Sequence, residues 1–180
     1  MKVEIDQALL ARHLREFGEK VVRRATRTGM SRTMAKAKTA MNREIRGHYK
    51  ISAAEIRAIL RITRSGGAAF TEIALEAPPF RGRALNLIRF NPQRAPKGLS
   101  VSIKRGSARP IVPGAFIANK GRTVFRRTGK ARLPIQPVRT IGIPQMFNTR
   151  SVRDNVEALI REQFPVEFQR AATHFSSRRP

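Results

Sequence analysis

The feature that most constrains this chain of 180 residues is a long run that contains no acidic residue. No Asp or Glu occurs between Glu76 and Asp154, a gap of 77 residues. Positions 61–148 hold 17 Lys and Arg and only two acids, within a chain whose net charge is +25. Ordinary surfaces intersperse both signs, and a field of one sign costs self-repulsion unless a partner balances it. The run therefore predicts contact with a nucleic acid or with an acidic protein surface.

The chain is apolar enough to fold. Its hydrophobic content of 41% excludes a disordered basic tail, and its length permits a core without disulfides. We therefore expect a single domain over residues 1–180. Cysteine is absent, which excludes disulfides and thiolate metal sites. No apolar run is long enough for a membrane span, and the charged N-terminus lacks the apolar region of a signal peptide. These features predict a soluble protein, intracellular when made, with no membrane partner.

The first zone, residues 1–60, has helical periodicity. Two apolar stripes follow spacings of three and four residues: Leu10, Leu14, Phe17 and Val21, then Met34, Ala37, Met41 and Ile45. Gly29 lies between the stripes, which indicates either two helices or one helix with a weak point. Ser52 followed by Glu55 is the pattern of a capping box, so we expect a short helix to begin there.

The second zone, residues 61–148, has the pattern of strands and loops. "RITRSGGAAFTEIALE" predicts two strands around Ser65-Gly66-Gly67. Partial alternation predicts further strands at "ALNLIRF" and "LSVSIKR", on either side of the loop "NPQRAPKG". "TVFRR" and "LPIQPVRTI" complete the candidates, and the prolines of the last one place it at a sheet edge.

The third zone, residues 149–180, returns to helix and ends in a short tail. Ser151 and Asp154 stand in capping positions, and Val152, Val156, Leu159 and Ile160 share one face. Pro165 is expected to kink or divide this helix. Helices, then a mostly antiparallel β-sheet, then a helix predict the α+β class.

A group of basic residues around "RTGKAR" is the first candidate site. Its members are Arg122, Arg126, Arg127, Lys130 and Arg132. On a hairpin tip they would project together and contact phosphates or carboxylates. The alternative is a solvated basic loop that serves solubility, and the acid-free run around the group favours contact over that alternative.

The apolar segment that precedes this group is the second candidate site, for docking of a protein. Pro113-Gly114 indicates a tight turn, and Ala115 is small enough for close approach. Phe116 and Ile117 would then form an apolar anchor beside a charged rim. The alternative is an ordinary strand that buries Phe116 inside its own domain.

No constellation of residues indicates catalysis, a cofactor or a metal. His13, His48 and His174 are far apart, the acids do not converge, and no phosphate-binding P-loop is present. There is no Trp and one Tyr, and most of the ten Phe stand at core positions rather than as stacking platforms. We therefore expect no enzymatic activity, and any nucleic-acid contact should be to the backbone.

The segment "RPIVPGAFIANKGRTVFRRTGKARLPIQPVRTIGIPQMF" carries a resemblance to a known family. It resembles the C-terminal half of the phage minor tail protein Z family, the lambda-like tail-completion proteins. The matching order is Ile111 to Ile117, Gly121 to Arg127, Gly129 to Ile135 and Ile143 to Phe147, ahead of a final helix. The specific match covers about 40 residues, while residues 1–60 match only in character. The dense Arg/Lys run that some relatives carry before this segment is absent.

The resemblance implies a structural virion protein of the tail or neck, assembled in the host cytoplasm. It implies a homo-oligomeric ring, with six subunits, at the head-proximal end of the tail. Such a ring would lie between the tail terminator or tail tube and the head-side connector, help head–tail joining, and surround the path of the genomic DNA. Each subunit of a ring needs two different faces. The alternative function is a sequence-nonspecific nucleic-acid-binding protein of architectural or ribosomal type.

Overall fold

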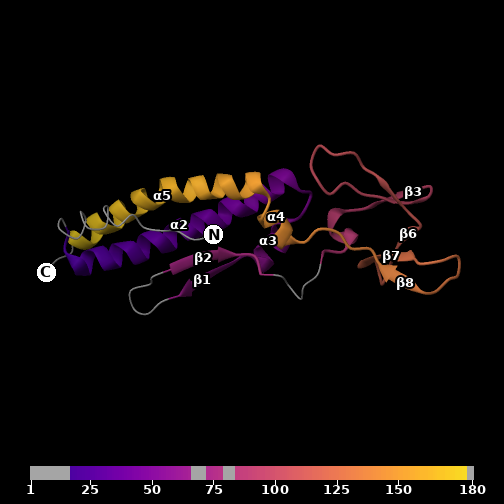
Figure 1. Cartoon of the computed structure of the whole chain (residues 1–180), viewed down its shortest axis with the longest axis horizontal. Coiled ribbons are helices and arrows are strands. Elements are labelled where there is room, and N and C mark those ends of the chain that lie inside the picture. The colour runs from indigo at the N-terminus through magenta and orange to yellow at the C-terminus, as the bar shows by residue number, and fades with distance from the viewer. Residues whose placement is uncertain (1–16, 66–71, 79–83, 178–180) are drawn as a thin grey trace. The chain divides into compact units, whose positions relative to one another are not determined.

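The structure is a computed structural model that describes residues 17–65, 72–78 and 84–177 (Figure 1). The chain divides into two compact units. We call them the helical unit, which draws on residues 1–41, 60–77 and 150–180, and the sheet unit, which draws on residues 42–59 and 78–149. Long helices and antiparallel sheets confirm the α+β class.

The helical unit is built on two long helices. Helix α2 (Glu19–His48) contributes its residues up to Met41, and α5 (Arg150–Ser176) lies beside it (Figure 1). Helix α2 is continuous through Gly29, which settles the alternative left open by the sequence. A Cβ at Gly29 would lie 3.0 Å from the backbone nitrogen of Phe168. Glycine therefore permits close approach of the two helices at this point.

The apolar stripes form the core as predicted. Met34, Ala37, Met41 and Ile45 are all fully buried, whereas Leu10 and Leu14 lie outside the described residues. On α5, Val152, Val156 and Ile160 are buried and Leu159 is half-buried. Burial of such a stripe supplies most of the stability of a helix in a protein.

The start of α5 and the effect of its proline differ from the sequence prediction. The helix begins at Arg150, so Ser151 lies inside it and does not cap it. Asp154 pairs instead with Arg150, at 3.6 Å between the guanidinium and carboxylate. Pro165 lies within the continuous helix and does not divide it. Its neighbours Phe164 and Phe168 are buried, and this packing compensates for the backbone hydrogen bond that proline removes.

A hairpin of β1 (Arg61–Ser65) and β2 (Glu72–Glu76) completes the helical unit. The strands are antiparallel, with Ile62 opposite Leu75, as the sequence predicted. The predicted turn at Gly66-Gly67 lies outside the described residues. Ile73 and Leu75 are fully buried, and they alternate with more exposed positions as a half-buried strand should.

The sheet unit contains two antiparallel sheets of three short strands. Their orders are β3-β4-β5 and β6-β7-β8. The first consists of β3 (Gln93–Ala95), β4 (Gly98–Ser100) and β5 (Ile111–Pro113), and the second of β6 (Ala115–Ala118), β7 (Thr123–Arg127) and β8 (Ile135–Pro137). The proline-bearing strand β8 is at an edge, as predicted. The unit also includes the last turns of α2, α3 (Ala53–Ile59) and α4 (Ile143–Phe147), and Ser52 caps α3 as expected, by accepting a hydrogen bond from the Glu55 N–H at 3.3 Å.

Two strand predictions and one loop prediction in this unit are wrong in detail. "ALNLIRF" forms the 3-10 helix η2 (Leu87–Phe90), because the Asn86 side chain accepts a hydrogen bond from the Ile88 N–H at 3.1 Å and caps a helical turn. "LSVSIKR" is strand only through Ser100. Conversely, β3 forms inside the predicted loop "NPQRAPKG". Strands of three residues are too short for alternation to identify them.

Candidate interaction surface

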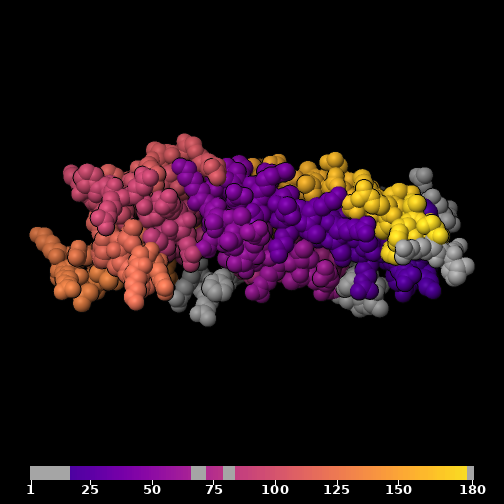
Figure 2. All heavy atoms as spheres, turned by 180° about the vertical axis from the view of Figure 1, so that it is seen from behind, coloured from indigo at the N-terminus to yellow at the C-terminus, as the bar shows by residue number. Residues whose placement is uncertain are grey.

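The sheet β6-β7-β8 carries both candidate sites. Gly114 joins β5 to β6 with a φ of 67°, a left-handed conformation that favours glycine, so the predicted turn at Pro113-Gly114 is present. Ala115 follows it and is buried, opposite Arg126 on β7. Part of the segment that contains β7 and β8, coloured orange, lies at the surface in the space-filling view (Figure 2).

The five basic residues are all exposed, but they do not gather at one tip. Arg122 lies in the turn before β7, which Asn119, Lys120 and Gly121 form with positive φ angles. The other four lie at the opposite end of β7 and in the loop that follows it: Arg126, Arg127, Lys130 and Arg132. We call these four the basic end. Arg122 is separated from it by the length of a strand of five residues.

An aromatic pair underlies the basic end. Phe116 on β6 is directly opposite Phe125 on β7, and the ring centroids are 6.3 Å apart. The guanidinium of Arg127, two residues after Phe125, lies over the Phe116 ring at 5.1 Å from its centroid. This cation–π contact holds one cation of the basic end against the sheet. Sequence patterns did not predict this contact, although side chains at residues i and i+2 of one strand share a face.

The predicted apolar anchor divides between the two faces of the sheet. Phe116 is half-buried, and Ile117, its neighbour on the strand, points to the opposite face and is 38% exposed. Leu133, in the loop after β7, is 66% exposed. Apolar surface therefore borders the basic end on both sides, but Phe116 and Ile117 do not form one continuous anchor.

None of the acidic residues that the structure describes neutralises this surface. The sheet unit has two acids in its sequence, Glu44 and Glu55. Glu55 pairs with Arg89, and Glu44 lies 3.8 Å from Arg43. Within the described ranges, no carboxylate lies within ion-pair distance of the basic end or of Arg122. The positive potential here is therefore available to an external partner.

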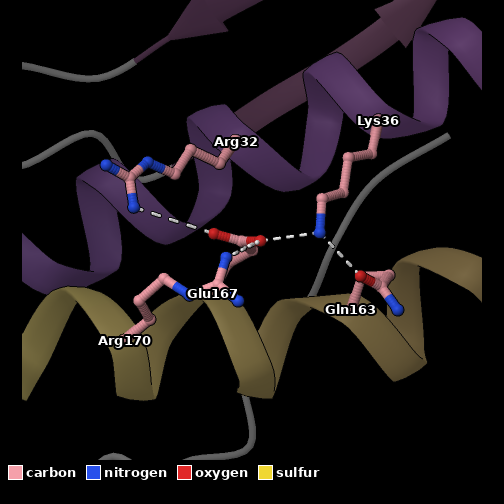
Figure 3. Close-up of polar contacts among 5 residues, drawn as sticks. All are labelled: Arg32, Lys36, Gln163, Glu167 and Arg170. Carbon is pink, nitrogen blue, oxygen red and sulfur yellow. Dashed lines mark hydrogen bonds and ion pairs between the residues drawn. The ribbon is translucent and has the colours of Figure 1, made fainter.

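A buried carboxylate in the helical unit provides a contrast (Figure 3). The side chain of Glu167 on α5 is 2% exposed, and its Oε1 accepts hydrogen bonds from Lys36 at 2.6 Å and from Arg170 at 3.1 Å. Arg32 lies 3.8 Å from its Oε2, and Lys36 also donates to Gln163. The hydrogen bond from Lys36 and the nearby positive charges lower the pKa of Glu167 below 4.5, against the opposing effect of burial. The cluster ties α2 to α5.

The described residues offer no sign of a metal centre or of a membrane span. No group of three or more His, Cys, Asp or Glu side chains that could hold a metal ion occurs in the part of the chain that the structure describes. None of the helices formed by those residues combines the length and the apolar character needed to cross a bilayer.

Comparison with known proteins identifies a family. The family model described as prophage minor tail protein Z (GPZ) matches residues 5–176. Neither a curated protein nor a solved structure matches the chain significantly. The matched range includes both units, with the basic end and the helices α2 and α5.

Proposed function

This chain belongs to the prophage minor tail protein Z family, and on that premise we propose that it is a ring subunit that completes the head-proximal end of the tail. Membership makes it a structural protein of a phage tail, with other virion proteins as partners. The finer role, joining the tail to the head around the DNA path, is our proposal. A homo-oligomeric ring, with six subunits as the expected number, would be its working form.

The observation that carries the proposal is the unneutralised basic end. Its four side chains are exposed, and no described carboxylate lies within ion-pair distance of them. Such a surface accelerates encounter with a negatively charged partner and fixes orientation. The exposed Leu133 and Ile117 and the half-buried Phe116 border the charged groups. Apolar contacts next to a polar rim are typical of protein interfaces.

Reversal of charge at the basic end tests this proposal. We expect Arg126→Glu with Arg127→Glu to leave the subunit folded, because both side chains are exposed. Two reversed charges at an interface should lower the yield of infectious particles by about two orders of magnitude. The measurement is the titre of a phage that carries the double variant, with electron microscopy of the lysate to count unjoined heads and tails.

The matched control is Arg94→Glu with Lys97→Glu. Both residues are exposed cations of the same unit, on and beside β3. This control should form particles at a normal yield. Normal head–tail joining by the Arg126/Arg127 variant would show that the basic end has no role in assembly. Sequence-independent DNA binding by an isolated monomer, without ring formation, would instead favour the architectural alternative.

A further inference from the structure

The sheet unit contains an apolar groove that is separate from the basic end. Its volume is about 650 Å³, within the usual range for sites that bind ligands or side chains. Its lining includes Val101 and Ile103 from the segment after β4, and Val138 and Ile141 from the segment after β8. Ile103, Val138 and Ile141 are only half-buried, so the groove is open to a partner.

The charged residues that line the groove are both cations. Lys104 and Arg139 are exposed and lie among aliphatic side chains, and the described lining includes no acid. An apolar groove with two unneutralised cations complements an occupant that has aliphatic side chains next to carboxylates. A nucleic-acid backbone fits poorly, because its charged phosphates would lose hydration against an apolar wall without apolar groups to bury.

The backbone beside the groove favours an extended occupant. Asn86 and Arg139 form an antiparallel bridge, in which the Leu87 N–H donates to the Val138 carbonyl and the Thr140 N–H donates to the Leu85 carbonyl. This pattern turns the N–H and carbonyl groups of Arg139 away from Asn86. In the described ranges neither group has a hydrogen-bond partner. They are available to an added strand, the mode known as β-augmentation.

We propose that the groove binds an extended acidic and aliphatic segment of another virion protein. The aliphatic side chains of the segment enter the groove, its carboxylates pair with Lys104 and Arg139, and its backbone pairs with that of Arg139. The inference rests on the proposed assembly role, but it concerns residues that the basic end does not use. It assigns a protein, rather than DNA, to this part of the sheet unit.

A peptide of defined sequence tests the groove. The probe is the octapeptide Ser-Asp-Leu-Val-Glu-Ile-Asp-Ser, acetylated and amidated, titrated into the full chain. Binding is measured by calorimetry and by methyl chemical shifts of Ile103 and Val138. The neutral analogue with Asn and Gln, and an analogue with Ser for each aliphatic residue, should bind about tenfold or more weakly. Equal binding of either analogue, no binding of the probe, or a single-stranded oligonucleotide that displaces it, would overturn the proposal.

Variants locate the binding site. Lys104→Glu with Arg139→Glu should weaken peptide binding about tenfold or more, and both residues are exposed, so the fold should persist. Arg94→Glu with Lys97→Glu should leave the dissociation constant within about twofold. An unchanged dissociation constant in the first variant would contradict the site. If the free natural chain self-associates and this variant does not, the occupant of the groove is a second copy of the chain. That result would overturn the choice of partner.

The groove and the basic end can fail independently. Arg126→Glu with Arg127→Glu should not change peptide binding, since neither residue lines the groove. Loss of head–tail joining in that variant, together with no peptide binding by the natural chain, would refute the groove alone. Normal head–tail joining in that variant, together with peptide binding by the natural chain, would refute the role of the basic end and leave the groove intact.

Discussion

The helical unit and the sheet unit are equal in length and nearly equal in basic residues, yet they differ sharply in charge. Each comprises 90 residues, and the helical unit has 18 Lys and Arg against 10 acids, whereas the sheet unit has 19 against 2. The net charge is therefore 18 − 10 = +8 in the helical unit and 19 − 2 = +17 in the sheet unit, and the difference comes from missing acids rather than from added bases. A count of basic residues alone would not reveal this difference between the units.

The units also use their charges differently. In the helical unit, acids pair with nearby bases, as Arg153 does with Glu157 at 3.6 Å and Arg23 with Glu19 at 2.6 Å. Glu167 goes further and gathers three cations around one buried carboxylate. In the sheet unit most cations face solvent without a described carboxylate nearby. The helical unit pairs its charges internally, whereas the sheet unit leaves most of its cations exposed.

The largest expected effect on stability comes from the sheet unit. In this unit Asn86 joins the 3-10 helix η2 to β7. Its side-chain oxygen accepts hydrogen bonds from the Val124 N–H at 2.9 Å and from the Ile88 N–H, and its amide nitrogen donates to the Val124 carbonyl at 3.0 Å. Asn86→Ala should cost about 3 kcal/mol, at about 1 kcal/mol for each lost hydrogen bond. Chemical denaturation and hydrogen exchange of the amides in β7 measure it. Asn148→Ala, at an exposed position, is the control, and equal losses in the two variants would deny Asn86 this role.

The second prediction concerns the close approach of α2 and α5. Gly29→Val should cost about 2 kcal/mol, because its Cβ would lie 3.0 Å from the Phe168 nitrogen and 3.1 Å from its Cα, and a backbone cannot yield easily. The control in the same helix is Gly47→Ala, whose Cβ meets nothing within 4 Å and which should gain about half a kcal/mol. Thermal denaturation measures both. A stable Gly29→Val variant would mean that the helices are not held in this contact.

The third prediction concerns acid stability. Because the pKa of Glu167 is lower in the folded chain than in the unfolded chain, its contribution is fully present above about pH 4.5 and is lost as the pH falls through the folded value. Glu167→Gln should lower the free energy of unfolding by about 1–2 kcal/mol at neutral pH. The variant should then lose less of its remaining stability on acidification than the natural chain does. Denaturation curves at several pH values measure it. Glu162→Gln, on the same helix but exposed, should match the natural chain, and an identical pH profile for both variants would exclude this cluster as the cause.

The smallest effect on stability is expected at Arg122 and at two residues of the basic end, Lys130 and Arg132. Arg122→Gln with Lys130→Gln and Arg132→Gln should change the free energy of unfolding by less than about 0.5 kcal/mol, because the side chains are exposed. If this surface meets DNA, the slope of log affinity against log salt should fall by about 0.9 for each residue that contacts a phosphate. A fluorescence titration with random duplex measures the slope. A marked loss of stability would show that these cations serve the fold instead.

Sequence patterns predicted what depends on periodicity and on composition. The stripe from Met34 to Ile45 identified the buried face of α2, Ser52 and Glu55 identified the start of α3, and "TVFRR" identified β7 with its bounds. The acid-free run identified the surface that lacks counter-charges. These features are local or additive, so neighbouring residues suffice to specify them.

Only the tertiary structure decided features that depend on contacts between distant residues. Asn86 ties the 3-10 helix η2 to β7 through Val124, 38 residues away. Lys36 and Glu167 meet across two helices, and Arg127 covers Phe116 because strand register brings β6 beside β7. The groove is lined by segments that lie far apart in the sequence, after β4 and after β8. Such pairings are set by the packing of the whole unit, and no local pattern in the chain encodes them.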